Sequence, residues 1–176
     1  GTDYPEWFQN HGGAFLSLAI DHYCYIALRI KPPFQEKRYR VAWRITEDVN
    51  SINSIKHPIV KHSLNFMKIK DGMDINYVGD LPGGSGLGSS SAFTVALNHA
   101  LHTTLGNKPN ALELANQAYF IEREKLEETI GIQDQIATAF GGFNYVIIKR
   151  DGSYIIEKVL LTKKQIENFL NRIILV

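Results

Sequence analysis

A glycine- and serine-rich stretch, DLPGGSGLGSSS at residues 80–91, separates an alternating apolar segment (73–79) from a strongly apolar one (91–105). Glycine lets backbone N–H groups take positive φ and approach a ligand closely. Serine at the start of a helix can cap free N–H groups, and the same helix end attracts phosphate. The stretch therefore predicts either a phosphate-binding turn or a flexible loop with a serine N-cap, and the loop alone favours neither.

The glycine spacing excludes two nucleotide-binding motifs. Gly83 and Gly88 have the G-x-x-x-x-G spacing of a Walker loop, but Ser89 stands where that motif requires lysine. The chain also has no G-x-G-x-x-G sequence. A nucleoside triphosphate bound here would need other residues to hold Mg²⁺ and to orient a nucleophile.

Two downstream acids are candidates for those roles. A helix expected over about 111–128 places Glu122 on its apolar face, together with Lys125. A buried carboxylate needs a cation or hydrogen-bond donors, so Glu122 could bind a metal or pair with Lys125 or an arginine. Asp134 could be an acid favoured by the helix dipole or a catalytic base. For each acid alone, the pattern favours the structural role.

Hydrophobic periodicity predicts an α+β domain with a mixed sheet packed against helices, because strands and helices mix without strict βαβ alternation. We expect strands at 38–45 and 73–79, two strands or one bent strand within 14–30, and a hairpin over 141–159 around Asp151-Gly152. We expect helices at 4–10, 57–68, 91–105, 111–128 and 162–172, and a short helix or turn at 131–140.

The bulk composition gives no indication of a nucleic-acid or membrane partner. The 176 residues have a formal net charge of +1. No apolar run reaches the length of a membrane span, and the N-terminus does not resemble a signal peptide. The lone cysteine, Cys24, cannot form an internal disulfide and is expected to be a packed core thiol. A reducing cytoplasm is the expected location.

Both ends of the chain suggest a fragment. The chain begins GTDYPEW, with no strand before it, and ends NRIILV, which is typical of a buried strand cut off midway. We therefore expect one domain over residues 1–172, and in residues 173–176 the start of a further domain.

Taken together, these residues resemble the GHMP kinases, a family that includes galactokinase, homoserine kinase and mevalonate kinase. Pro82–Ser90 fits the family loop P-x-x-x-G-L-G-S-S at every fixed position. Glu122-Arg123 and then Asp134 follow in the family order. The closest likeness is to sugar kinases of the D-glycero-D-manno-heptose 7-phosphate kinase type, with galactokinase- or fucokinase-like enzymes as near neighbours. Three stretches carry this likeness: GTDYPEWFQNHGGAFLSLAID, FIEREKL and QDQIATAFGGFNY.

The resemblance implies a ribosomal-protein-like fold and an ATP- and Mg²⁺-dependent phosphotransferase acting on a sugar or sugar phosphate, here at the 1-position of the heptose. It implies that Ser90 and Glu122 bind Mg²⁺ and that Asp134 acts as the base or orients the acceptor hydroxyl. The ATP phosphates would be held by Pro82, Gly83, Gly84, Ser85, Gly86, Leu87, Gly88, Ser89 and Ser90. The sugar would be bound by Thr2, Asp3, His11, Gly12, Gly13 and Asp134.

Family members also carry an earlier N-terminal strand and a C-terminal domain with a third glycine-rich motif, so the segment alone is expected to bind nucleotide weakly. One rival is a non-catalytic sugar- or nucleotide-binding module, although such a module would not require Ser90, Glu122 and Asp134 together. A second rival is an RNA-associated domain, which the near-zero net charge disfavours. The oligomeric state stays open, with a homodimer as one expectation.

Overall fold

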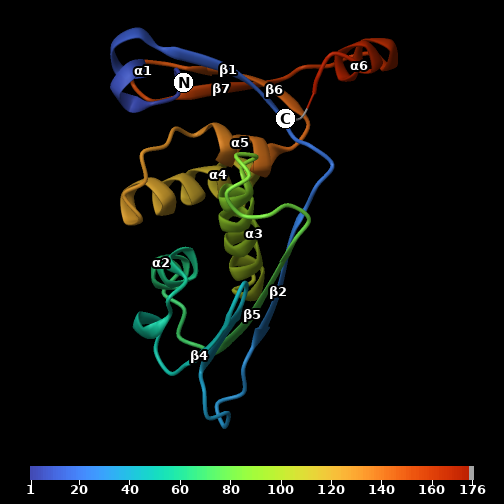
Figure 1. Cartoon of the computed structure of the whole chain (residues 1–176). Helices are drawn as coiled ribbons and strands as arrows, with labels where there is room; N and C mark the ends of the chain where they lie inside the picture. Colours follow the sequence, from blue (N-terminus) through green and yellow to red (C-terminus); the bar gives the residue numbers. More distant parts are fainter. Residues whose placement is uncertain (175–176) are drawn as a thin grey trace.

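Helices and strands follow one another irregularly along the chain, and the computed structural model describes residues 1–174 (Figure 1). The helical elements are α1 (Pro5–His11), the 3₁₀ turn η1 (Ile52–Ser54), α2 (Pro58–Phe66), α3 (Ser89–Thr104), α4 (Ala111–Phe120), the π-helical turn η2 (Ile121–Lys125), α5 (Gln133–Phe140) and α6 (Lys163–Leu170). The strands are β1 (Gly13–Leu18), β2 (Cys24–Ile30), β3 (Tyr39–Ala42), β4 (Thr46–Val49), β5 (Met73–Gly79), β6 (Phe143–Ile148) and β7 (Tyr154–Lys158). The α+β class is confirmed.

The strands form two sheets, where the sequence predicted one. A three-stranded antiparallel sheet has the order β1-β6-β7, and a four-stranded sheet has the order β2-β5-β3-β4. The second sheet is mixed, because β3 pairs in parallel with β5 and every other pair in it is antiparallel. Segment 14–30 contributes one strand to each sheet, and Ala19–Tyr23 connects them. Periodicity along one segment cannot reveal which partner each half will pair with.

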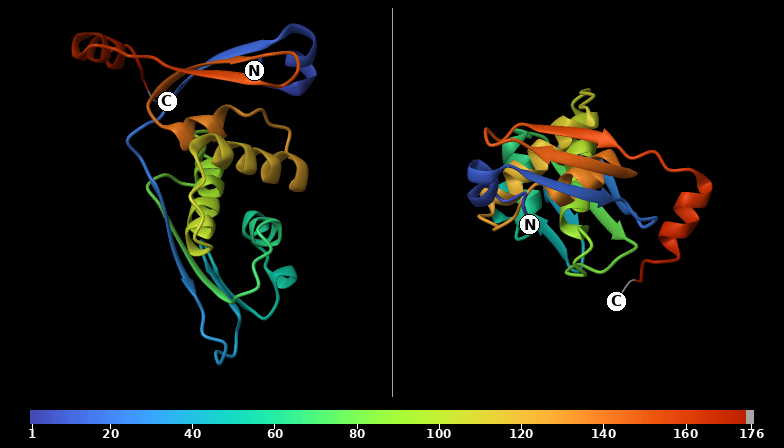
Figure 2. Two further views of the ribbon diagram at one scale, coloured as in Figure 1. Left: turned by 180° about the vertical axis from the view of Figure 1, so that it is seen from behind. Right: turned by 90° about the horizontal axis from the view of Figure 1, so that it is seen from above.

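Helix α3 is buried, as predicted, and it packs against β2, α2, α4 and α5. Phe93, Leu97 and Leu101 join the hydrophobic core over the four-stranded sheet. Ile132 and Ile136 belong to a second core under the three-stranded sheet. Figure 2 shows the same arrangement from behind, with α3 along one sheet and α5 beneath the other. Helices α3, α4 and α5 thus lie between two sheets that each have their own core (Figure 1).

The second long helix is shorter than the predicted 111–128. It begins with a capping box, in which Asn110 and Glu113 each accept from the other's backbone N–H. It continues as η2, where the N–H of Leu126 donates to the carbonyl of Ile121, five residues earlier. This wider turn leaves Lys125 exposed, so the prediction that Lys125 faces inward was wrong.

The C-terminal part contains the predicted hairpin and helix. Gly152 has φ 83° in the turn, and the Asp151 carboxylate accepts from the backbone N–H and hydroxyl of Ser153. The expected strand at 171–176 is not seen in residues 171–174, and residues 175–176 lie outside the described range. Within the described residues, no helix has the length and apolar character needed to cross a membrane.

Strand β4 was not predicted, because its four residues TEDV are short and mostly polar. It forms because its backbone pairs with β3 in the register Tyr39↔Val49. Its Glu47 is buried and accepts hydrogen bonds from the backbone N–H groups of Lys56 and His57 and from the Trp43 indole.

Candidate functional site

The glycine-rich loop leads directly into α3. Gly84, Gly86 and Gly88 have φ values of 79°, 74° and 71°, in the left-handed region that favours glycine. A Cβ atom at Gly84 or Gly86 would meet nothing within 4 Å. The backbone of this loop is therefore open to a ligand and not packed against the protein.

The N-cap of α3 is Gly88, and no side chain caps it. The alternative of a serine N-cap was wrong, because Ser89 and Ser90 already lie inside the first helical turn. The first N–H groups of a helix have no intrahelical acceptor. Together with the helix dipole, they favour an anion such as phosphate at this end.

Glu122 is only 1% exposed and lies beside the first turn of α3, where it contacts Ser91. One carboxylate oxygen, Oε1, accepts from the Thr94 hydroxyl at 2.5 Å. The other, Oε2, accepts from the Ser91 hydroxyl at 2.9 Å and from the Gln135 amide. Within residues 1–174 no ion pair involves Glu122, so pairing with Lys125 or an arginine was the wrong alternative.

Burial raises the pKa of Glu122, and the three hydrogen bonds oppose that rise. The nearby charge of Asp134 adds a smaller upward contribution to the same pKa. A bound cation would stabilise the ionised form of Glu122, because its charge would offset both the cost of burying the carboxylate and the repulsion from Asp134.

Ser90 does not contact Glu122 in this structure. Its side chain is exposed, and its carbonyl oxygen lies 3.0 Å from the Thr94 hydroxyl, whose single proton is directed to Glu122 at the shorter distance. Ser91, one position further along α3, is the serine that faces Glu122. The predicted metal role of Ser90 stays a prediction.

Asp134 lies in the first turn of α5 and faces the loop. A Cβ atom added to Gly88 would lie 3.5 Å from Asp134 Cγ. Burial raises the pKa of Asp134, and the neighbouring Asp3 charge raises it further. Among the described residues its carboxylate has no hydrogen-bond donor, so it is available to a ligand hydroxyl.

Asp3 is buried beside Asp134, at 5% exposure, and is enclosed by the 131–133 backbone. Its Oδ2 accepts from the Gln133 N–H at 3.3 Å. A Cβ atom at Gly131 would lie 1.8 Å from that oxygen, so only glycine fits there. Asp3 thus lies close enough for its charge to act on Asp134, and the predicted role of the two acids toward a sugar stays a prediction.

The other predicted sugar-binding residues are engaged elsewhere. The Thr2 hydroxyl donates to the Ala14 carbonyl and accepts from its N–H, which anchors Thr2 to β1. His11 is exposed at the end of α1, with its ring 4.6 Å from that of Trp7. Gly12 is the C-cap of α1, and Gly13 is the first residue of β1, paired with Ile148 of β6. Their roles toward a sugar stay predictions.

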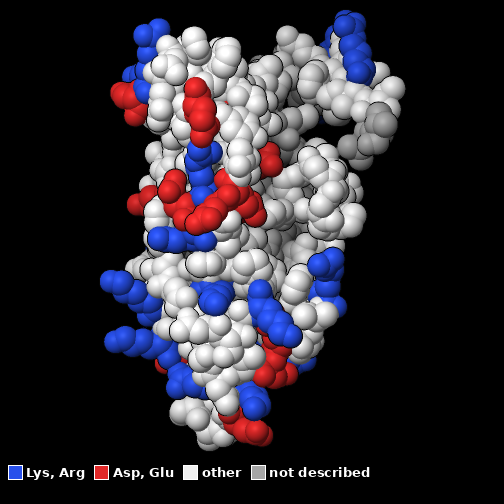
Figure 3. Space-filling model, turned by 60° about the vertical axis from the view of Figure 1, so that its left-hand side comes forward, with Lys and Arg blue, Asp and Glu red and all other residues white. Residues whose placement is uncertain are grey.

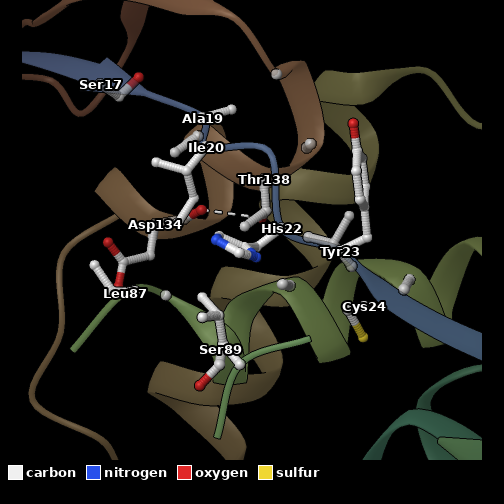
Figure 4. Close-up of a pocket in the computed structure, with 18 of the residues that line it drawn as sticks. Ser17, Ala19, Ile20, His22, Tyr23, Cys24, Leu87, Ser89, Asp134 and Thr138 are labelled. Atoms are coloured by element: carbon white, nitrogen blue, oxygen red, sulfur yellow. Dashed lines mark hydrogen bonds between the residues drawn. The ribbon is translucent and has the colours of Figure 1, made fainter. Parts of the chain in front are cut away.

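A cavity of about 730 Å³ lies beside the loop, between the β1–β2 connection and helices α3, α4 and α5. Figure 4 shows His22 pointing into it from that connection, while the Asp134 carboxylate points toward Leu87. Cys24 also lines it, and burial raises the pKa of this thiol to about 11, so the thiol stays protonated and unreactive.

Sequence reasoning missed the residues that surround Glu122 and Asp3. Ser91, Thr94 and Gln135 donate hydrogen bonds to Glu122, and Gly131 packs against Asp3. The one available signal was the presence of Ser91 and Thr94, three residues apart, on a helix otherwise rich in apolar residues. Their shared partner comes from a distant part of the chain, which the pattern alone does not reveal.

The residues around Glu122 fit a magnesium ion bound together with a nucleotide. Mg²⁺ is usually held by one or two carboxylates plus substrate phosphates and water. Glu122, the neighbouring hydroxyls and the phosphate-binding end of α3 supply that donor set. Among the described residues there is no cluster of three or more His, Cys, Asp or Glu that could hold a metal without a nucleotide.

Residues 52–142 match the family model described as GHMP kinases N terminal domain. The chain is 36% identical over 117 residues to a D-glycero-alpha-D-manno-heptose 7-phosphate kinase of Campylobacter jejuni, covering 66% of this chain and 32% of that protein. It is 31% identical over 168 residues to a galactokinase of Chloroflexus aggregans, covering 87% of this chain and 41% of that protein.

Among solved structures, a D-glycero-D-manno-heptose 1-phosphate kinase from Bacteriodes thetaiotaomicron shares the fold, with a TM-score of 0.81 at 24% identity. That match covers 93% of this chain and 56% of the other. The chain thus spans well under half of these curated relatives and just over half of this solved structure.

Proposed function

The chain belongs to the GHMP kinases, whose N-terminal domain it contains, and from this premise we propose that it is the nucleotide-binding part of an ATP- and Mg²⁺-dependent sugar kinase. The enzyme would transfer the γ-phosphate of ATP to a hydroxyl of a sugar or sugar phosphate in the cytoplasm.

One observation carries the proposal. The open glycine loop ends at Gly88, where an added Cβ would lie 3.5 Å from Asp134 Cγ, and the exposed Asp134 carboxylate has no hydrogen-bond donor among the described residues. A phosphate at the start of α3 and an acceptor hydroxyl at Asp134 would therefore be neighbours. Phosphoryl transfer depends chiefly on such positioning and on charge neutralisation.

Each group has a defined role in this proposal. The N–H groups of 82–90 bind the ATP phosphates. Glu122 holds Mg²⁺, with Ser90 as the predicted second ligand. Bound Mg²⁺ supplies the positive charge that neutralises the transferring phosphoryl group. Asp134 accepts a hydrogen bond from the sugar hydroxyl and takes its proton, while Asp3 orients the sugar.

For the acceptor we propose D-glycero-D-manno-heptose 7-phosphate, phosphorylated at the 1-position. The support is the Campylobacter jejuni relative, named as a kinase of this heptose phosphate. A galactokinase-like activity is the second candidate, because the Chloroflexus aggregans relative aligns over 87% of the chain.

The test is ATP consumption by the full-length protein that carries this domain. The acceptor panel contains D-glycero-D-manno-heptose 7-phosphate, galactose, fucose and mannose, and Asp134→Asn is the matched control. Turnover on the heptose phosphate that the variant loses supports the proposal. Turnover on galactose alone supports the second candidate. ATP binding without turnover on any sugar would indicate a binding module or another acceptor.

A further inference from the structure

Gln135 is buried beside Glu122, at 1% exposure, and follows Asp134 directly on α5. Successive residues of a helix point about 100° apart. Asp134 therefore faces the glycine loop, while Gln135 faces α3 and η2. One short helix thus supplies Asp134 itself and the Gln135 side chain that contacts Glu122.

The Gln135 amide closes a triangle of hydrogen bonds. Its Nε2 donates to Glu122 Oε2 and, at 3.1 Å, to the Ser91 hydroxyl. Ser91 in turn donates to the same Glu122 oxygen at 2.9 Å. Three elements that are distant in sequence (α3, η2 and α5) are joined at this one oxygen.

The amide can take only one orientation while Glu122 is ionised. Turning it over would point the Gln135 carbonyl oxygen at the carboxylate, and two acceptors would face each other. In the observed orientation Oε1 of Gln135 has no hydrogen-bond partner among the described residues. A buried amide oxygen without a hydrogen bond is destabilising. Gln135 keeps this orientation because its Nε2 then donates to Glu122.

The two oxygens of Glu122 are not equivalent. A carboxylate oxygen has two lone pairs. Oε2 accepts from two donors, Ser91 and Gln135, and is saturated. Oε1 accepts from Thr94 alone and keeps one lone pair free.

We propose that Gln135 is a positioning residue that, with Ser91, saturates Oε2 of Glu122 and so presents Oε1 to the cation of the bound nucleotide. This inference rests on the proposed function. The inference adds Gln135, the residue next to Asp134, as a group that orients the metal ligand Glu122 and does not contact the substrate.

The test measures cation affinity directly. Mn²⁺ binding to the full-length protein with a non-hydrolysable ATP analogue is followed by electron paramagnetic resonance. Gln135→Met keeps the side-chain volume and removes the amide. Gln117→Leu is the matched control, because it removes another helix-borne glutamine that bonds His102. Loss of such an orienting partner costs about 10–100-fold in metal affinity.

We expect that loss for Gln135→Met and none for Gln117→Leu, with nucleotide affinity in the absence of metal unchanged. The Mg²⁺ concentration needed for half-maximal turnover should rise, and saturating Mg²⁺ should restore kcat. A merely structural role would instead lower kcat at every Mg²⁺ concentration. If Gln135→Met does not fold, Gln135→Asn withdraws the amide by ~1.5 Å and should weaken Mn²⁺ binding in the same way.

Unchanged Mn²⁺ affinity in a folded Gln135 variant would overturn the inference and leave the proposed function standing. Absence of Mn²⁺ binding in the unmodified protein, with nucleotide still bound, would overturn the metal role of Glu122 in the proposed function itself, and with it the inference.

Discussion

At the scale of single residues, the site contains acids held where ionisation is unfavourable. Burial and the charge of Asp3 raise the pKa of Asp134 in the folded chain. A carboxyl whose folded pKa lies above its unfolded value makes its full stabilising contribution below the unfolded pKa. That contribution is lost as pH rises through the folded pKa. Ionised Asp134 therefore opposes folding at neutral pH.

Asp134→Asn should consequently be more stable than the unmodified protein at neutral pH, although turnover falls on the order of 10²–10⁴-fold. Thermal unfolding followed by circular dichroism across pH measures the first effect. The gain should shrink as pH falls through the raised pKa of Asp134 and vanish below about 4, where both states of the unmodified protein are protonated. A variant less stable than the unmodified protein at neutral pH would show that Asp134 makes an unrecognised stabilising contact.

The sequence predicted part of this residue-level picture. It indicated that Glu122 is buried and needs partners, because four-residue spacing from Ala118 places it on an apolar face. It did not identify Ser91, Thr94 and Gln135 as the partners, since they come from two other helices. It also favoured Ser90 over Ser91, because the motif gives the order of the serines and not the angle at which α3 leaves Gly88.

At the scale of elements, glycines of the loop are required for two different reasons: a positive φ and a close approach to another side chain. Gly84 and Gly88 both have positive φ, but only at Gly88 would an added Cβ atom come within 4 Å of another group, the Asp134 side chain. A left-handed conformation costs a non-glycine residue about 1–2 kcal/mol. Alanine at either position should therefore carry a similar backbone strain.

We expect Gly84→Ala and Gly88→Ala to weaken nucleotide binding to a similar extent, with the larger loss of kcat for Gly88→Ala, whose new methyl group contacts Asp134. Isothermal titration with ATP and steady-state kinetics separate the two effects. Equal kcat values would mean that the contact between the loop and Asp134 has no part in catalysis.

Gly131 is required because the backbone at this position packs closely against Asp3. A Cβ atom there would lie 1.8 Å from Asp3 Oδ2 and 2.7 Å from the Asp3 carbonyl oxygen. Overpacking typically costs about 1–3 kcal/mol, so Gly131→Ala should lower the free energy of unfolding by that amount and raise KM for the sugar. Gly83→Ala is the control, because its Cβ would meet nothing within 4 Å. Urea denaturation compares them, and similar midpoints would contradict the prediction.

Element boundaries were predicted best where local signals decide them. Strand 73–79 and the hairpin around Asp151-Gly152 match the structure, because alternation and turn residues are local. Strand β4 and the π-helical turn η2 were missed, because both depend on partners. The first needs β3 beside it, and the second widens a helix so that Glu122 can reach α3.

At the scale of the whole molecule, charge is divided unevenly. Residues 29–70 carry ten lysines and arginines against three acids, a net +7, in a chain of net +1. Figure 3 shows basic side chains over the lower half of one face and a band of acidic ones above them. The overall charge that argued against anionic partners thus conceals a strongly basic half.

This basic half, residues 29–70, contacts α3 through aromatic side chains. Arg44 lies over the Trp43 ring at 5.2 Å, and His57 stacks between Trp43 and Phe93 of α3, with ring distances of 4.6 and 4.8 Å. A field of this kind raises the association rate of anions and is screened by salt. Nucleotide association should therefore slow as ionic strength rises.

Charge reversal tests this directly. Arg44→Glu and Lys56→Glu should slow the association of a fluorescent ATP analogue and flatten its salt dependence, with little change in kcat. The control Lys164→Glu lies on α6, outside the basic half. Stopped-flow mixing at several salt concentrations gives the rates, and equal slowing by all three variants would contradict steering by the basic half.

The two hydrophobic cores have a mechanical consequence. The glycine loop continues into α3, whose Phe93 and Leu97 belong to the core over the four-stranded sheet, whereas Ile132 and Ile136 tie Asp134 to the core under the other sheet. In the proposed reaction, the residues that bind the phosphate donor and the acceptor hydroxyl would therefore be anchored in different cores. A small displacement of one core relative to the other would change the distance that the phosphoryl group crosses in this reaction, so the rigidity of the contact between the cores would govern how well the two reactants are aligned.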